Sequence, residues 1–150
     1  MASRKEALNL EVLEMISIME KKGAVDDRLG KIRDMNETSN PFPLLELIPT
    51  FNKDAYSILR EMSVALGKTD LDYGHLEELC SKMEGKTSSI GACRMARACS
   101  RLRQATDEKS KDGCLNAFEI LKNEYLSLNW MLEWTAELER RILSLETNDP

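Results

Sequence analysis

The sequence predicts an all-α protein with six helices, in which the last four form an antiparallel four-helix bundle and the first two cover it. Apolar residues recur every three or four positions through most of the chain, the spacing of one helix face. Glycine (7) and proline (4) are few, and β-branched runs are scarce, which argues against a sheet. The 150 residues suit one domain with one hydrophobic core, expected to span residues 1–150.

Two helices are expected before residue 40. The first carries an apolar stripe that stops near Gly23, and Asp26 is expected to cap the second, shorter one. The stripe of the first helix is Leu8, Leu10, Val12, Leu13, Ile16 and Met19. The apolar positions of the second are Leu29, Ile32 and Met35.

The third helix is expected to run from Pro41 to Gly67. Asn40 followed by Pro41 is typical of an N-cap and a first helical residue, and Gly67 ends the pattern. Pro49 lies inside this segment and is expected either to kink the helix or to delay its start. The apolar markers are Leu44, Leu47, Ile48, Phe51, Tyr56, Ile58, Leu59 and Leu66.

Three further helices complete the predicted bundle. The fourth begins at residues 70–72 and reaches about Glu84, the fifth covers roughly 91–106, and the last begins near Asp112. The stripe of the last helix, spaced three or four residues throughout, indicates a long bundle helix. It consists of Leu115, Phe118, Leu121, Tyr125, Leu128, Leu132, Thr135, Leu138 and Ile142. Trp130 and Trp134, one turn apart, are expected to pack against the N-terminal helices.

Composition excludes several classes of function. The net charge is −5 and no basic face stands out, so nucleic acid is not an expected partner. No segment approaches the roughly 20 apolar residues that a membrane helix needs, so no membrane association is expected. The first residues, MASRKEALNLEVLEMI, show no signal-peptide pattern.

The cysteines favour an intracellular protein with free thiols. None forms a CxxC pair, and with a single histidine a zinc site is not expected; we expect neither metal nor cofactor. Reduced, mostly buried thiols suit a cytoplasmic or nuclear protein. They are Cys80, Cys93, Cys99 and Cys114.

The fourth helix divides into two faces at about 100° per residue. Its core face holds Leu76, Leu79, Cys80 and Met83, while a bare outward strip is formed by Ser81, Gly85 and Ser88, flanked by Lys82 and Glu84. A helix-interior glycine costs about 1 kcal/mol relative to alanine, so Gly85 needs a reason. Either it is a C-cap, with KTSS as the following turn, or it allows close approach of a partner's backbone.

No catalytic machinery is evident, and we do not expect an enzyme. His75, the one histidine, is expected to be a solvated side chain, turned about 120° around the helix from Ser81. Ser81 has no neighbouring base in the sequence pattern that would make it a nucleophile. Glu77 and Glu78 are adjacent and splay apart, so they do not form an acid–base pair.

The segment DYGHLEELCSKMEGKTSSIGACR resembles the signature of plant histidine-containing phosphotransfer proteins, approximately HQLKGSSSSIGAQR. Gly85 matches its glycine, residues 88–92 match SSIGA, and Arg94 matches its arginine. SNP at 39–41 resembles a motif at the start of the family's third helix. DGCL at 112–115 and NEY at 123–125 resemble EGCL and HEY. The resemblance covers nearly the whole chain and implies a six-helix fold and a role in phosphoryl relay between receiver domains in cytokinin signalling.

The departures from that signature change the implied function. Ser81 falls where the phosphoaccepting histidine belongs, and Glu84 falls where the family has lysine. The resemblance therefore implies a pseudo-phosphotransfer protein, a monomer that binds the receiver domains of hybrid histidine kinases and response regulators without relaying phosphate, and so damps signalling. The implied receiver-docking residues are Leu29, Ile32, Glu78, Ser81, Lys82, Glu84, Gly85 and Ser88.

Two alternatives remain at this point. One is an active phosphorelay mediator between hybrid kinases and response regulators, using His75 or another acceptor. The other is a helical interaction module unrelated to two-component signalling. A carboxylate at Glu84 is also expected to repel an acidic receiver pocket, which would weaken docking.

Overall fold

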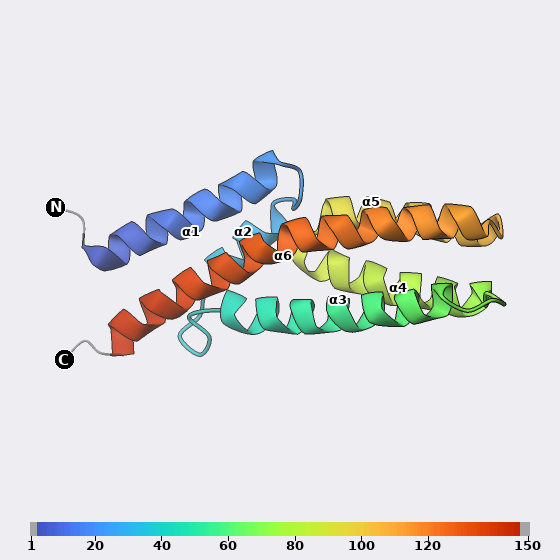
Figure 1. Cartoon of the computed structure of the whole chain (residues 1–150). Coiled ribbons are helices and arrows are strands. Elements are labelled where there is room, and N and C mark those ends of the chain that lie inside the picture. The colour runs from blue at the N-terminus through green and yellow to red at the C-terminus, as the bar shows by residue number, and fades with distance from the viewer. Residues whose placement is uncertain (1–2, 148–150) are drawn as a thin grey trace.

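The computed structural model describes residues 3–147, which form six α-helices (Figure 1). They are α1 (Arg4–Lys21), α2 (Arg28–Asp34), α3 (Leu44–Leu66), α4 (Tyr73–Ile90), α5 (Cys93–Asp107) and α6 (Lys111–Thr147). Within this range no strand is present, only an isolated bridge between Glu37 and Asn40. The all-α prediction is confirmed; positions 1–2 and 148–150 of the expected domain lie outside the described residues.

Helices α3 to α6 form the bundle. α3 packs on α4, α4 on α5, α5 on α6, and α6 closes the ring against α3 (Figure 1). With 37 residues, α6 is roughly 55 Å long and continues well beyond the other bundle helices. α1 packs along this extension, and α2 lies against α4. The predicted arrangement of a C-terminal bundle with two N-terminal covering helices is confirmed.

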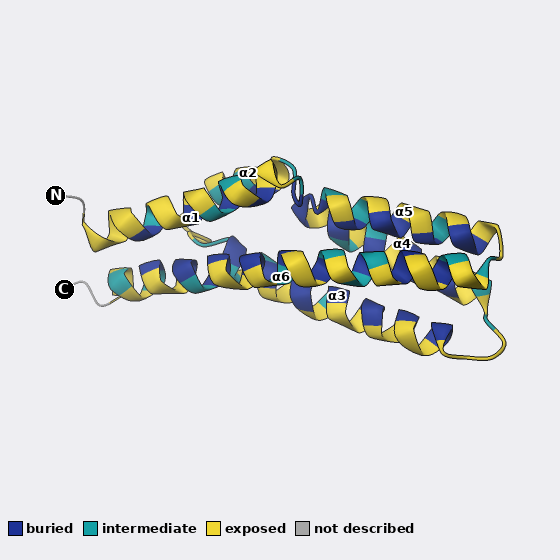
Figure 2. Cartoon of the chain, turned by 45° about the horizontal axis from the view of Figure 1, so that its top comes forward, coloured by how far each residue is buried: buried dark blue, intermediate teal, exposed yellow. Residues whose placement is uncertain are grey.

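The core follows the helical stripes, with buried positions turned inward on every long helix (Figure 2). On α1, which packs chiefly on α6, the buried residues recur at every third or fourth position: Leu8, Val12, Ile16 and Met19. Leu10 and Leu13, predicted to belong to this stripe, are 58% and 45% exposed. A helix with one main neighbour buries one narrow face, and these two positions point off it.

Three other residues predicted to lie on apolar stripes are exposed, so those predictions are wrong: Met35, Tyr56 (62% exposed) and Leu115. Met35 lies beyond the last residue of α2, and Leu115 lies on the outward side of α6; both are exposed. Trp130 and Trp134, predicted to pack against the N-terminal helices, are 56% and 38% exposed and line a hollow together with Met15 of α1. Their neighbours Met131, Leu132 and Thr135 take the buried positions on that part of α6.

The start of α3 differs from the prediction. The helix begins at Leu44, because Asn40 is used in a tight turn: its N–H donates to the Glu37 carbonyl at 3.0 Å, and it accepts from the Glu37 N–H at 3.0 Å. Asn40 and Pro41 are therefore not its N-cap and first residue. Pro49 lies inside the helix and does not delay its start.

The end of α4 differs more, and the difference bears on function. The helix continues to Ile90, six residues past the predicted end at Glu84, and stops at Gly91, whose φ is 74°. The left-handed conformation at Gly91 lets the Ala92 N–H bond the Thr87 carbonyl at 2.9 Å. Gly85 is therefore not the C-cap but lies within the helix, and KTSS is helical rather than a turn.

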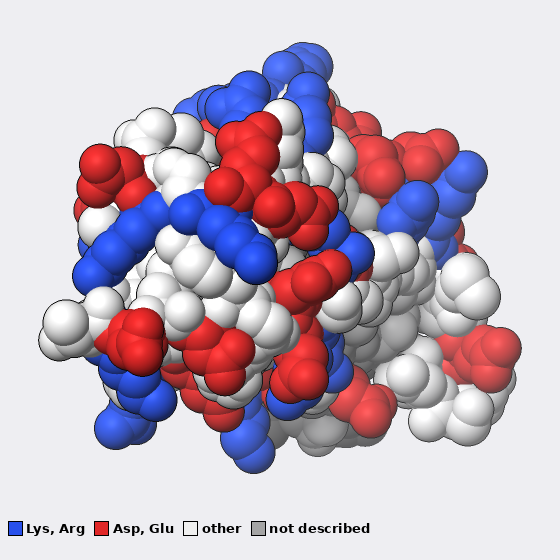
Figure 3. Space-filling model, turned by 90° about the vertical axis from the view of Figure 1, so that its right-hand side faces the viewer, with Lys and Arg blue, Asp and Glu red and all other residues white. Residues whose placement is uncertain are grey.

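The surface carries mixed charge. Viewed from the end of the bundle where the α3–α4 and α5–α6 connections lie, basic and acidic side chains are interspersed (Figure 3). Among the helices described, none is long and apolar enough to cross a membrane.

Candidate functional site

The outward face of α4 is an open strip of small side chains. Ser81, Gly85 and Ser88 are exposed, as predicted, while Cys80 and Met83 on the opposite face are 0% exposed. A Cβ built on Gly85 would have no heavy atom within 4 Å apart from its immediate surroundings in the helix. Because Gly85 is helix-interior and its surroundings are open, packing within the described residues does not explain why this position is glycine.

Arg103, from the neighbouring helix α5, contacts two side chains of α4 at the centre of this strip. Arg103 of α5 donates from Nη2 to Ser81 Oγ at 2.7 Å, and the same nitrogen lies 3.0 Å from Glu84 Oε2. Arg103 Nε is buried and has no acceptor among the described residues. Ser81 and Glu84 therefore share one cation, although only Glu84 carries a formal charge.

This contact changes the expected electrostatics of Glu84. The sequence suggested a carboxylate facing a partner alone, but the side chain of Glu84 is 37% exposed and that of Arg103 is 33% exposed, and the two are paired. An ion pair in contact presents little net charge at a distance. The repulsion of an acidic partner is therefore weaker than the sequence implies.

The C-terminal end of the strip is fixed by α2. Arg28 Nη1 donates to the Ser88 carbonyl at 2.9 Å and lies 3.3 Å from Ser88 Oγ. The N-cap of α2 is Asp27 rather than the predicted Asp26. The Asp26 carboxylate still accepts from the Arg28 N–H at 2.9 Å, and the Asp26 N–H donates to the Gly91 carbonyl. A Cβ on Gly91 would collide with the Asp26 carboxylate. This glycine is thus required both by its backbone conformation and by the close approach of the α1–α2 connection.

One predicted docking residue does not reach the surface. Leu29 is 0% exposed, because it is the residue through which the short helix α2 is anchored in the core, so its side chain is not available to a partner. Ile32, one turn further, is half-buried. Glu78 and Lys82 are exposed on α4.

Buried thiols lie directly beneath the strip. Cys99 Sγ of α5 donates to the Cys80 carbonyl at 3.3 Å, and both residues are fully buried. The neighbouring Cys80 thiol and burial both raise the pKa of Cys99. Burial also raises the pKa of Cys114. All four cysteines are free, as predicted, and Cys93 is the one that is partly exposed.

The contacts of Ser81 and His75 show which groups lie beside the two side chains considered as phosphoacceptors. Within residues 3–147, Ser81 Oγ has no hydrogen bond to an imidazole or carboxylate that would act as a base. The His75 side chain is 45% exposed, and its Nδ1 lies 4.0 Å from Glu78 Oε2. No group of three or more potential metal ligands is found among the described residues.

Sequence analysis missed Arg103 and Arg28, because each reaches α4 from another helix, 22 and 60 residues away. A partial signal for Arg103 is present: it is turned about 180° around α5 from Arg94, toward the side of the helix that faces α4.

The fold matches that of known structures. A crystal structure of a rice histidine-containing phosphotransfer protein superposes with a TM-score of 0.87 at 26% identity, covering 94% of this chain and 99% of that one. The bundle with two covering helices therefore resembles the fold of this histidine-containing phosphotransfer (HPt) protein. No protein-family model matches the chain.

Relatives found by sequence are also histidine-containing phosphotransfer proteins. Histidine-containing phosphotransfer protein 1 of rice (Oryza sativa subsp. japonica) is 24% identical over 91% of this chain and 92% of its own length. Pseudo histidine-containing phosphotransfer protein 2 of rice is 26% identical over 90% of this chain and 89% of its own length. Together with the structural match, these relatives support placing the chain in the plant HPt family of two-component signalling. Active and pseudo members are about equally similar to it.

Proposed function

We propose that this protein is a pseudo-HPt protein of the cytokinin phosphorelay, a single-domain monomer of the cytoplasm and nucleus. It binds receiver domains of hybrid histidine kinases and response regulators without accepting or relaying phosphate, and so lowers signal flux. It is not an enzyme. The observation that carries this proposal is the exposed Ser81, held by Arg103, at the centre of the α4 strip where the family's phosphoaccepting histidine belongs.

The chemistry of serine supports the loss of relay. Neutral imidazole attacks an aspartyl phosphate without prior activation, and the resulting phosphoimidazole is labile enough to pass the group on. A serine hydroxyl needs a base to become a nucleophile. Ser81 Oγ instead accepts a hydrogen bond from Arg103, which withdraws electron density from the oxygen. A phosphoserine ester, once formed, would also be too stable to transfer its group back to a receiver aspartate.

The shape of the strip supports continued docking. Gly85 leaves space for another backbone, and Ser81 and Ser88 add little bulk on either side. The pairing of Glu84 with Arg103 removes much of the charge penalty that an acidic receiver pocket would otherwise meet. Docking without transfer is the property expected of a competitor.

A binding experiment tests docking. Purified receiver domains of a hybrid kinase and of a response regulator are titrated against the protein and against Gly85→Arg, which places a long side chain on the open strip. We expect micromolar binding that Gly85→Arg weakens at least tenfold. Asn116→Arg, on the exposed side of α6, adds the same charge and should bind like wild type. Equal binding by the Gly85 and Asn116 variants would place the docking face elsewhere.

A competition experiment tests the damping role. The protein is added in increasing amounts to a reconstituted relay in which an active HPt protein receives phosphate from a hybrid-kinase receiver. We expect the rate of transfer to fall as the protein occupies the receiver, and Gly85→Arg to have little effect at the same concentration. An increase in flux would contradict the proposal and favour an active mediator.

A further inference from the structure

A second charged surface lies on the face of α5 that looks away from α4. Between Cys93 and Thr106 the helix holds four arginines and no acidic residue, in a chain whose net charge is −5. Three of them, Arg94, Arg97 and Arg101, are spaced by three and four residues and share one face. The fourth, Arg103, is used by Ser81 and Glu84 on the other side.

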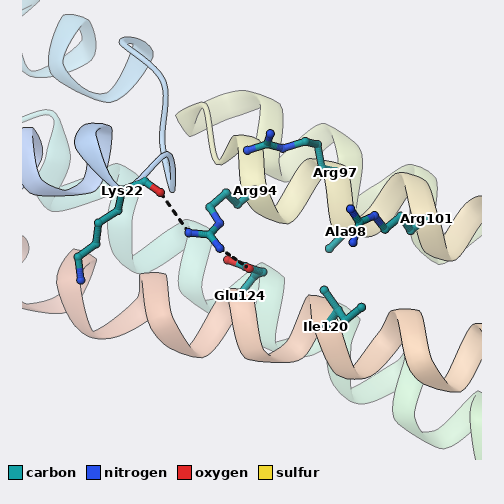
Figure 4. Close-up of a pocket in the computed structure, with 7 residues that line it drawn as sticks. All are labelled: Lys22, Arg94, Arg97, Ala98, Arg101, Ile120 and Glu124. Atoms are coloured by element: carbon teal, nitrogen blue, oxygen red, sulfur yellow. Dashed lines mark hydrogen bonds and ion pairs between the residues drawn. The ribbon is translucent and has the colours of Figure 1, made fainter.

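These three arginines border a hollow of about 340 Å³ between α5, α6 and the end of α1 (Figure 4). Ala98 of α5 and Ile120 of α6 contribute its apolar part, and Lys22 lies at the α1 end. No residue of α4 lines it. The hollow is therefore separate from the strip around Ser81.

The cations of this surface divide into one that is structural and three that are unpaired. Arg94 already has partners within the protein. Its Nη2 lies 3.2 Å from Glu124 Oε1, and its Nη1 donates to the Lys22 carbonyl at 3.1 Å, so it joins α5 to α6 and to the end of α1. The side chains of Lys22, Arg97 and Arg101 make no ion pair with any described residue. In Figure 4 the guanidinium groups of Arg97 and Arg101 lie along α5 rather than meeting at one point.

We propose that this surface binds an acidic polypeptide segment of a partner protein, laid along α5 over the hollow. Arg97 and Arg101 are separated by about 6 Å along the helix axis, the rise that also separates carboxylates four residues apart on a partner helix. Guanidinium groups bind carboxylates through paired, charge-assisted hydrogen bonds. Ala98 and Ile120, which line the same hollow as the arginines, offer an apolar contact to the partner segment.

The charge distribution favours a short acidic segment over nucleic acid. A polyanion would extend past three cations onto a surface whose overall charge is negative and would be repelled there. A segment with a few carboxylates meets only the local positive field. Because α4 is not involved, such a partner can bind while a receiver occupies the Ser81 strip, and the proposal does not depend on receiver docking.

The test uses the intact protein and a fluorescent helical peptide of about 20 residues with glutamates at every fourth position. Binding is followed by anisotropy at about 0.15 M salt, where only short-range charge contacts persist. We expect a dissociation constant below about 1 mM, and Arg97→Gln/Arg101→Gln to weaken binding at least tenfold. The matched control is Lys53→Gln/Arg60→Gln on α3, which lowers the net charge equally and should change binding less than twofold.

Three results would overturn the proposal. One is absence of peptide binding to wild type. Another is equal loss in both double variants, which would show attraction by net charge alone. The third is tighter binding of a single-stranded oligonucleotide of equal charge that depends on the same two arginines, which would identify nucleic acid as the ligand. A peptide with glutamine in place of glutamate should not bind.

Discussion

Arg103 donates a hydrogen bond to Ser81 at 2.7 Å while it pairs with Glu84 at 3.0 Å, so two residues that depart from the HPt signature share one partner. The serine cannot be considered without the glutamate, because both depend on the same Nη2 atom. Replacing Ser81 alone with histidine would leave the Arg103–Glu84 pair beside the new imidazole. The two departures therefore form one unit.

A double-mutant cycle should detect this link. Arg103→Met and Glu84→Gln, made singly and together, are expected to show a coupling of about 0.5–1 kcal/mol in the free energy of unfolding, the range for partly exposed ion pairs. Urea denaturation provides the measurement. Arg101→Met combined with Glu84→Gln is the control and should be additive, since Arg101 has no ion-pair partner among the described residues. Additivity in both cycles would mean that the Arg103–Glu84 contact does not persist in solution.

Replacing Gly85, inside α4, and Gly91, at its C-cap, with alanine should change the free energy of unfolding in opposite directions. Gly91→Ala should destabilise by at least about 2 kcal/mol, because its φ of 74° strains any L-residue and its Cβ would collide with Asp26. Gly85→Ala should stabilise by about 1 kcal/mol, since it lies inside a helix with open space around it. Chemical unfolding of both variants measures this. If Gly85→Ala is destabilising instead, α4 ends at Gly85 and this glycine is the C-cap.

The contact of α2 with α6 depends on a buried ion pair. Arg33 donates to Glu139 at 2.9 Å and to Asn9 Oδ1 at 2.7 Å, and the Glu139 side chain is 2% exposed. Arg33→Met should cost about 3 kcal/mol, because it leaves a buried carboxylate without its cation. Arg33→Met/Glu139→Leu should recover most of that loss. Lys31→Met, which breaks a fully exposed pair with Asp27, is the control and should have little effect. A double variant no more stable than Arg33→Met would contradict this explanation.

Thiol reactivity should separate the cysteines. Cys80, Cys99 and Cys114 are 0% exposed, and the raised pKa values of Cys99 and Cys114 keep those two protonated at pH 8, so little thiolate is present to react. Cys93 is partly exposed and should be modified first by a disulfide reagent under native conditions. In denaturant, four thiols should react. Rapid native modification of more than one thiol would show that α4 and α5 separate readily.

The sequence predicts the fold well where a helix has neighbours on one defined side. The stripe from Phe118 to Ile142 and the two faces of α4 follow from angular position alone, because bundle packing enforces that periodicity. It fails for Leu10 and Leu13, which the apolar stripe of the first helix assigns to the core. Both lie on α1, at the end of the molecule where α6 extends past the bundle, and there too few neighbours exist to bury every apolar residue.

The candidate site is only partly predictable from sequence. The exposure of Ser81 and Gly85 follows from one helix, but the end of α4 does not, because Gly85 and Gly91 are both plausible stops. The collision with Asp26, 65 residues earlier, makes Gly91 the required glycine. Likewise, the charge state of the strip depends on Arg103, a residue of another helix. The helical periodicity of α4 is enough to predict which side chains are exposed, but the charge and the end of the strip depend on contacts with other helices.

The central claim is that the protein binds receivers without taking phosphate from them, and transfer of radiolabel from a phosphorylated receiver tests it most directly. Wild type, Ser81→His and Ser81→His/Glu84→Lys are incubated with the same labelled receiver. We expect no label on wild type, weak labelling of the single variant, and stronger labelling of the double variant, because lysine replaces a carboxylate near the developing phosphoryl charge. Labelling of wild type as readily as the double variant would contradict the account.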